Sequence, residues 1–252
     1  MALRSEKIIV VLGTGGTIAG TAASAGDNIG YAAAQVGVVQ LLDAIPALGA
    51  ALGGHALVTE QVAQIDSKDM SFAVWQQLAG RAAHWLAQSE VQGIVITHGT
   101  DTLEETAYFL QSVLHPAKPV VLTCAMRPAT AVAPDGPQNV LDAVAVAIHP
   151  GARGVVAVCA GAIHSALDVQ KVHPYQVNAF SSGDAGVLGY VEEGGLRLFR
   201  NWPETKTGPS QSAIENIVNT SHWPRVEIVM NYAGANGAVV QALVAQGVQG
   251  LV

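Results

Sequence analysis

Three polar turns hold the residues whose types and spacing could carry chemistry. They are residues 13–17, 66–69 and 99–102, and each directly follows a run of residues that is predicted to be a strand. Each turn contains a hydroxyl residue, and two of the three also contain acids. In an open parallel sheet, ligands bind beyond the carboxyl ends of the strands. If the three runs are parallel strands, we expect their turns to form one site.

Thr17, in the first turn, is a candidate nucleophile or phosphate ligand. Glycines at 13, 15 and 16 let the backbone turn sharply and leave amide groups pointing outward. An ordinary tight turn, in which the threonine caps the next segment, is the alternative. The glycines do not fit a dinucleotide fingerprint, because Ile18 stands where the third glycine belongs, and no Gly-Lys-Ser/Thr follows for a Walker loop. Nucleotide binding is therefore the least favoured reading.

The other two turns suit a zwitterionic ligand. A carboxylate on Asp101, beside Thr100, could bind an ammonium group, and Ser67 could bind a carboxylate beside exposed backbone amides. The alternative is structural, because acids at a helix start offset its dipole, and Thr102 with Glu105 matches a capping box. Taken together, the two turns predict a site for an amino acid.

Strands and helices alternate through the first 160 residues. Strands are expected at 8–12, 56–65, 91–97, 119–124 and 154–159, and helices at 36–48, 69–86, 102–114 and 140–148, with Asp69 capping the second of these. Short connections between such elements are typical of βαβ units. The expected fold class is α/β, with a mostly parallel sheet flanked by helices.

The pattern weakens after residue 161. A hairpin is expected from 187–191 and 196–199, and strand, helix and strand at 226–230, 237–246 and 248–252. We therefore expect an N-terminal α/β catalytic domain over 1–200, a linker over 201–224 and a partial C-terminal α/β domain over 225–252. A βαβ unit of about 30 residues cannot form a stable core alone. The expectation is a truncated second domain, or one that docks on a partner.

Composition excludes several classes of protein. The 252 residues are 50% hydrophobic and 12% charged with a net charge of −7, which excludes a disordered chain and argues against nucleic-acid and anionic-membrane partners. No apolar run approaches the ~20 residues of a membrane span. The eight histidines show no metal-ligand spacing, and the two cysteines are expected to be reduced and buried. The first residues lack a signal-peptide pattern, so the expected location is the cytoplasm.

Two segments together resemble the signature motifs of the bacterial-type L-asparaginase (asparaginase/glutaminase) family. They are GTGGTIAG at 13–20 and THGTDTLEETA at 97–107. Further matches are Tyr31 with VGV at 36–38, AMRP at 125–128 and DGP at 135–137. The resemblance runs from about Lys7 to the end of the chain. Family members continue past this length into a complete second α/β domain.

The resemblance implies roles for two groups of residues. Thr17 corresponds to the primary nucleophile, and Tyr31, on a flexible lid, helps to activate it. Thr100, Asp101 and Lys171 correspond to a second catalytic group, in which Lys171 adjusts the Thr100 hydroxyl directly or through water.

The resemblance also implies how substrate binds. Ser67 and Asp101 correspond to the pair that holds the α-carboxylate and the α-ammonium group. The wider binding set is Asp66, Ser67, Gly99, Thr100 and Asp101. Lys68 departs from the family pattern, because related enzymes often place a neutral or acidic residue there.

The implied function is hydrolysis of L-asparagine to L-aspartate and ammonia by a threonine nucleophile, with no metal or cofactor. The implied assembly is a homodimer or homotetramer that takes a small-molecule substrate, L-asparagine or also L-glutamine. Two alternatives are a glutaminase-asparaginase with broader amide specificity and a non-catalytic amino-acid-binding relative.

Overall fold

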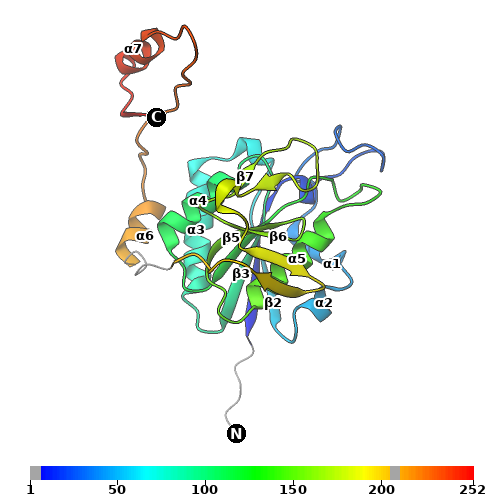
Figure 1. Cartoon of the computed structure of the whole chain (residues 1–252). Coiled ribbons are helices and arrows are strands. Elements are labelled where there is room, and N and C mark those ends of the chain that lie inside the picture. The colour runs from blue at the N-terminus through cyan, green and yellow to red at the C-terminus, as the bar shows by residue number, and fades with distance from the viewer. Residues whose placement is uncertain (1–6, 205–210) are drawn as a thin grey trace. The chain divides into compact units, whose positions relative to one another are not determined.

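The computed structural model describes residues 7–204 and 211–252 (Figure 1). It divides into two compact units, Met1–Val218 and Asn219–Val252. Part of the segment expected to be a linker is helical, because α6 (Gln211–Val218) lies within it. This helix belongs to the first unit, where Gln76 of α3 (Phe72–Leu86) donates to the carbonyl of Ile217. None of the helices in the described ranges is long and apolar enough to cross a membrane.

Within the described residues, the first unit is built on an eight-stranded sheet with the order β10-β9-β6-β5-β4-β3-β1-β2. Strands β2, β1, β3, β4 and β5 are parallel, and β6, β9 and β10 are antiparallel. The bounds are β1 Ile8–Gly15, β2 Ala56–Ile65, β3 Val91–Thr97, β4 Pro119–Thr123, β5 Gly154–Cys159, β6 Ala162–Ser165, β9 Gly189–Glu192 and β10 Gly195–Leu198. This architecture confirms the expected α/β class.

Helices cover both faces of the sheet (Figure 1). Ile9 and Val11 of β1 pack in one core with α1, α2 and α5, whereas Val10 and Leu12 pack in a second core with α3 and α4. A strand buried on both faces has no polar side, which explains the continuous apolar runs in the sequence. The remaining bounds are α1 Val38–Asp43, α2 Leu48–Ala51, α4 Leu103–Leu114 and α5 Gly136–Ile148.

The crossover from β4 to β5 has the opposite hand to its neighbours. The chain steps from β3 to β4 to β5 in one direction across the sheet. Helix α4 packs with α3 on one face, yet α5 packs with α1 and α2 on the other. Because β-α-β crossovers are almost always right-handed, the α5 crossover is the left-handed exception. It carries residues 124–135 across the carboxyl edge of the sheet, beside the predicted site.

Three local expectations were wrong. Ser71, not Asp69, is the N-cap of α3, and Asp69 instead lies in a short 3-10 helix. Thr102 begins α4 without a side-chain cap, because its hydroxyl donates to the carbonyl of Ser67. The helix expected at 36–48 is split into α1 and α2, because Pro46 disfavours helical geometry in the residue before it.

Both cysteines are buried and free of a disulfide bond, as expected. Cys124 follows β4, Cys159 ends β5, and their Sγ atoms are 3.2 Å apart. The hydrogen bond to Cys159 and burial raise the pKa of the Cys124 thiol well above its usual value. Both side chains therefore act as small apolar groups in the core.

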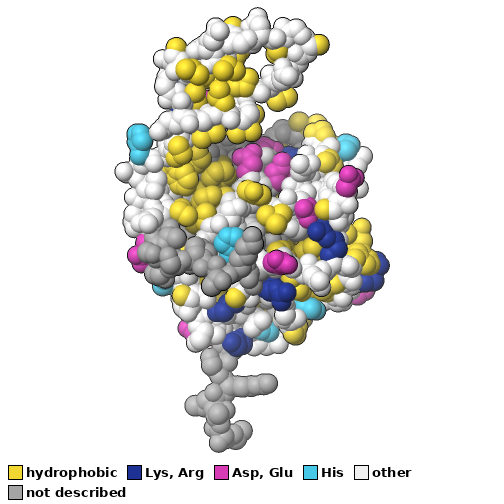
Figure 2. All heavy atoms as spheres, turned by 60° about the vertical axis from the view of Figure 1, so that its left-hand side comes forward, with side chains coloured by type: hydrophobic (Ala, Val, Ile, Leu, Met, Phe, Trp, Pro, Cys, Tyr) yellow, Lys and Arg dark blue, Asp and Glu magenta, His cyan; other side chains and the backbone are white. Residues whose placement is uncertain are grey.

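The second unit is one small β-α-β arrangement. Strands β11 (Val226–Glu227) and β12 (Gly250–Leu251) are parallel, and α7 (Ala238–Ala245) connects them. Hydrophobic side chains gather on its surface (Figure 2). Its exposed hydrophobic residues include Ile228, Met230, Tyr232, Val239 and Val244. Two short strands and one helix are too small to bury these groups in a core of their own.

Candidate active site

The three polar turns meet at one edge of the sheet. They follow β1, β2 and β3, which are neighbours in the order β2-β1-β3. From β1 the chain first forms β2 on one side of β1. It then crosses back and forms β3 on the other side of β1. In open α/β sheets such a reversal creates a crevice at the carboxyl ends of the strands. The structure therefore brings the predicted turns together at a switch point.

Close backbone packing holds the turns against each other. Gly16 has a φ of 81°, and a Cβ there would overlap the backbone of Gly99. A Cβ on Gly99 would in turn overlap the side chain of Ser67. Thr17 and Thr100, the residues after these two glycines, are therefore carried by turns that touch through their main chains.

The glycine contact predicts a stability effect. Gly16→Ala is expected to lower the free energy of unfolding by about 1–3 kcal/mol, because it adds both a strained φ and a backbone overlap. Gly49→Ala, in helix α2, has open space around its added Cβ and is the matched control, expected to be neutral or slightly stabilising. Urea unfolding of both variants measures the difference, and equal effects would contradict the packing described.

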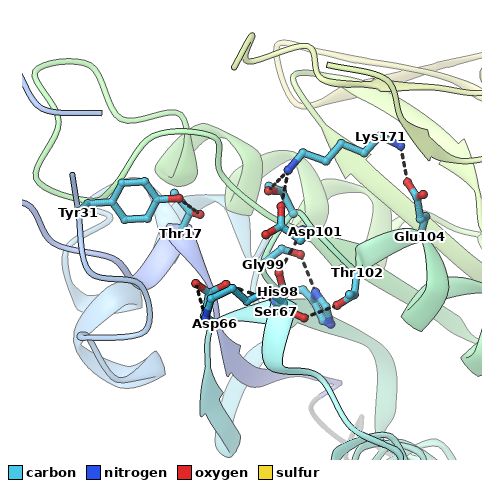
Figure 3. A network of polar contacts seen from close by, with 12 residues as sticks. Thr17, Tyr31, Asp66, Ser67, His98, Gly99, Asp101, Thr102, Glu104 and Lys171 are labelled. Carbon is cyan, nitrogen blue, oxygen red and sulfur yellow. Dashed lines mark hydrogen bonds and ion pairs between the residues drawn. The ribbon is translucent and has the colours of Figure 1, made fainter. Parts of the chain in front are cut away.

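Thr17 lies at the centre of the site (Figure 3). Its Oγ is 2.7 Å from the phenol oxygen of Tyr31, and only 6% of the residue is exposed. Tyr31 lies on a loop that is closed at its base by reciprocal backbone hydrogen bonds between Thr21 and Ala32. Figure 3 shows Thr17 between Tyr31 on one side and Lys171 with Asp101 on the other.

Lys171 is brought in from the antiparallel part of the chain. It belongs to β7 (Gln170–Lys171), which pairs with β8 (Phe180–Ser181). Its Nζ donates to Thr100 Oγ1 at 2.8 Å and forms an ion pair with Asp101 Oδ1 at 2.6 Å. Because an ammonium group only donates, the Thr100 oxygen accepts and its own hydrogen remains available for another partner.

Ser67 is tied to the third turn by two hydrogen bonds. Its Oγ accepts from the Asp101 amide at 3.1 Å, and its carbonyl accepts from the Thr102 hydroxyl at 2.9 Å. The hydroxyl hydrogen of Ser67 therefore remains available to a ligand acceptor, such as a carboxylate.

Lys68 is engaged by the acids of its own turn. Its Nζ is 2.7 Å from Asp69 Oδ2 and 3.4 Å from Asp66 Oδ2. The hydrogen bond to Asp69 raises the pKa of Lys68. The side chain is 61% exposed, so solvent and these carboxylates screen its charge. Asp66 therefore sits at the site's edge with its carboxylate directed to its own turn, where it also accepts from the Lys68 amide.

Two residues of the site were not predicted from the sequence. Glu104 was interpreted as a helix-dipole acid, but its carboxylate accepts from the backbone amide of Lys171. His98 was counted among scattered histidines, yet it is fully buried between β3 and the third turn, with Nδ1 2.7 Å from the Gly99 carbonyl. Its position at a strand end inside the second motif was the available signal.

Electrostatics around His98 favour the neutral ring. Burial lowers its pKa to about 4, and the Gly99 hydrogen bond opposes this shift only in part. The imidazole is therefore uncharged at neutral pH. Among the described residues, no group of three or more His, Cys, Asp or Glu side chains could hold a metal ion.

The loop of the left-handed crossover contacts the segment that carries Tyr31. The Asp135 carboxylate accepts from the amides of Met126 and Arg127 at 2.9 and 3.0 Å, which shapes the loop after β4. This loop is also hydrogen-bonded to the start of the Tyr31 loop, where the Ala129 amide donates to the Gly20 carbonyl at 2.9 Å. The AMRP and DGP segments thus hold the base of the loop that carries Tyr31.

The sequence is similar to known proteins over most of its length. Residues 8–204 match the family model described as Asparaginase, N-terminal. The chain is 40% identical to the glutaminase-asparaginase of Pseudomonas fluorescens biotype A over 97% of its own length and 66% of that relative. It is 38% identical to L-asparaginase 2 of Escherichia coli strain K12, over 97% of the chain and 68% of the relative.

A solved structure gives the same result. A crystal structure of a probable cytoplasmic L-asparaginase from Campylobacter jejuni superposes with a TM-score of 0.88 at 39% identity. The match covers 98% of this chain and 74% of that structure. The chain spans about two thirds of the length of the curated relatives it matches. A family model over most of the chain, together with these identities, shows that the chain belongs to the asparaginase family.

Proposed function

We propose that this protein hydrolyses the side-chain amide of L-asparagine to give L-aspartate and ammonia, with Thr17 as nucleophile. The observation that carries the proposal is the Thr17–Tyr31 hydrogen bond of 2.7 Å beside a second hydroxyl, Thr100, that accepts from Lys171. A threonine hydroxyl is a weak nucleophile and needs a neighbour that takes its proton. The 2.7 Å contact supports Tyr31 as that neighbour.

The proposed reaction has two steps. Thr17 Oγ attacks the amide carbon while its proton passes through the Tyr31 oxygen to the leaving nitrogen, so the C–N bond breaks and ammonia departs. Water then attacks the resulting ester, the C–O bond to Thr17 breaks, and a proton returns to Thr17. The Thr100 oxygen accepts from Lys171, and its own hydrogen is available to orient the attacking water.

Substrate binding is proposed to use the second and third turns. The Ser67 hydroxyl donates to the α-carboxylate. The Asp101 carboxylate oxygen that does not contact Lys171 accepts from the α-ammonium group. Gly99 and Asp66 shape the pocket walls. L-Glutamine is proposed as a second, slower substrate, because one relative is named glutaminase-asparaginase. From the family resemblance we further propose that the protein is a cytoplasmic homodimer or homotetramer. Analytical ultracentrifugation tests the assembly.

Ammonia release from the purified chain tests the proposed function. A coupled assay with L-asparagine, L-glutamine and D-asparagine is expected to show turnover of the first, less of the second and least of the third. Absence of release from a folded chain would overturn the proposal. In that case a rise in melting temperature with L-asparagine or L-aspartate would support the binding-only alternative.

A further inference from the structure

A chain of three side chains leads from the protein surface to the third turn. Trp75 of α3 donates from Nε1 to Thr106 Oγ1 at 2.9 Å. Thr106, fully buried on α4, has its Oγ1 3.0 Å from Nε2 of His98. The other ring nitrogen of His98 lies 2.7 Å from the Gly99 carbonyl oxygen. None of these three side chains belongs to the proposed reaction.

The direction of every hydrogen bond in this chain follows from the acceptor at its end. A carbonyl oxygen cannot donate, so His98 Nδ1 must carry the hydrogen that Gly99 accepts. A neutral imidazole has one hydrogen, so Nε2 is bare and accepts from the Thr106 hydroxyl. The Trp75 indole only donates, so the Thr106 oxygen accepts from it. The hydroxyl hydrogen of Thr106 remains to be donated to His98 Nε2. The network thus permits a single tautomer.

The orientation of the Gly99 carbonyl fixes the next amide. The peptide bond between Gly99 and Thr100 is trans, so its C=O and N–H groups point in opposite directions. Since the carbonyl oxygen of Gly99 contacts His98, the Thr100 N–H points to the opposite side of this peptide, away from the His98 ring. The Gly99 backbone packs against Gly16, the residue before Thr17, so the turn that carries Thr17 lies beside this peptide. A backbone amide on that side can donate to negative charge that develops on the amide oxygen of a substrate.

We propose that Trp75, Thr106 and His98 are positioning residues that lock the Gly99–Thr100 peptide with its N–H toward the reacting carbonyl. The catalytic consequence of this inference rests on the proposed function. The tautomer of His98 is independent of the proposed function. The packing of Trp75 against Phe109, with ring centroids 5.1 Å apart and planes 14° from parallel, holds the outer end of the chain. Without the Thr106 donor, His98 can rotate or change tautomer, and the peptide is free to turn.

The kinetic test uses two substitutions at one buried position. Thr106→Val keeps the shape but removes the donor, and it is expected to lower kcat roughly tenfold or more while KM changes less than about threefold, because a donor to developing charge acts mainly in the transition state. Thr106→Ser restores the hydroxyl and is expected to recover kcat. An unchanged kcat in Thr106→Val, or equal losses in both variants at matched folded fraction, would overturn the proposal.

The spectroscopic test does not depend on turnover. Long-range ¹H–¹⁵N spectra of the histidine rings are expected to show His98 as the Nδ1–H tautomer in the full chain, and a mixture of tautomers in Thr106→Val. An Nε2–H ring in the unaltered chain would overturn the inference even if the enzyme is active. If the chain releases no ammonia but His98 shows the expected tautomer and its dependence on Thr106, the proposed function fails while the network stands.

Discussion

Thr17→Ala is expected to reduce ammonia release from L-asparagine by about 10⁴-fold or more, since removal of a nucleophile leaves only binding and charge stabilisation. The alanine has no atom that can form the ester, and Tyr31 loses the partner 2.7 Å from its phenol oxygen. The cost in stability is expected to be small, about 1 kcal/mol for one lost hydrogen bond. Thermal unfolding and the ammonia assay on the same sample separate the two effects.

Matched substitutions make this result specific. Thr17→Ser keeps a hydroxyl and is expected to retain measurable turnover, whereas Thr59→Ala, on the outer strand β2, is a threonine-to-alanine change away from the site and should not alter turnover. The site contains a second candidate hydroxyl, Thr100. If Thr17→Ala kept more than a tenth of the activity while Thr100→Ala abolished it, the roles of the two threonines would have to be exchanged.

Mass spectrometry of a rapidly quenched reaction adds a direct assignment. The proposed mechanism requires a transient ester on the peptide that contains Thr17, whose mass exceeds that of the unmodified peptide by the mass of aspartic acid minus that of one water. The same adduct on the peptide that contains Thr100 would contradict the assignment. Thr17→Ala serves as the blank in which no adduct is expected.

The sheet could be predicted because its signals are local. The ranges 56–65 and 91–97 match β2 and β3. For β3 the signal is a mostly apolar run followed by a polar turn, which is typical of a strand buried on both faces. The caps could not be predicted in the same way. Thr102 lies in a capping-box sequence, but its hydroxyl donates to the carbonyl of Ser67, 35 positions away, and does not cap the helix. The unusual hand of the α5 crossover likewise has no signature in the residue pattern.

The candidate site likewise contains residues that local patterns predict and residues that they do not. Thr17, Ser67 and Thr100 follow strands that the pattern identifies, so their convergence could be argued from topology alone. Tyr31 and Lys171 could be named only through the family resemblance, because one lies on an irregular loop and the other on a two-residue strand 70 positions beyond Asp101. The roles of Glu104 and His98 depend on partners that are fixed only once the sheet has assembled.

Lys171→Met is expected to lower kcat by about 10²–10⁴-fold, the usual range for loss of a group that assists proton transfer. The methionine keeps most of the volume of the side chain but removes the donor to Thr100 Oγ1, so the hydroxyl can rotate and no longer presents its hydrogen in a fixed direction. Steady-state ammonia release measures the change. Lys118→Met is the matched control, because that Nζ donates to the carbonyls of Leu86 and Gln88, outside the site.

The same ammonium group also neutralises Asp101, so its two functions must be separated. Lys171→Arg keeps the positive charge, but a planar guanidinium cannot reproduce the position of a single Nζ between Thr100 and Asp101. We therefore expect the arginine variant to keep a KM near that of the unaltered chain while kcat stays low. Methionine, which leaves Asp101 unpaired, should change both constants. If arginine restored kcat fully, charge alone would account for Lys171, and the proposed alignment of the Thr100 hydroxyl would be wrong.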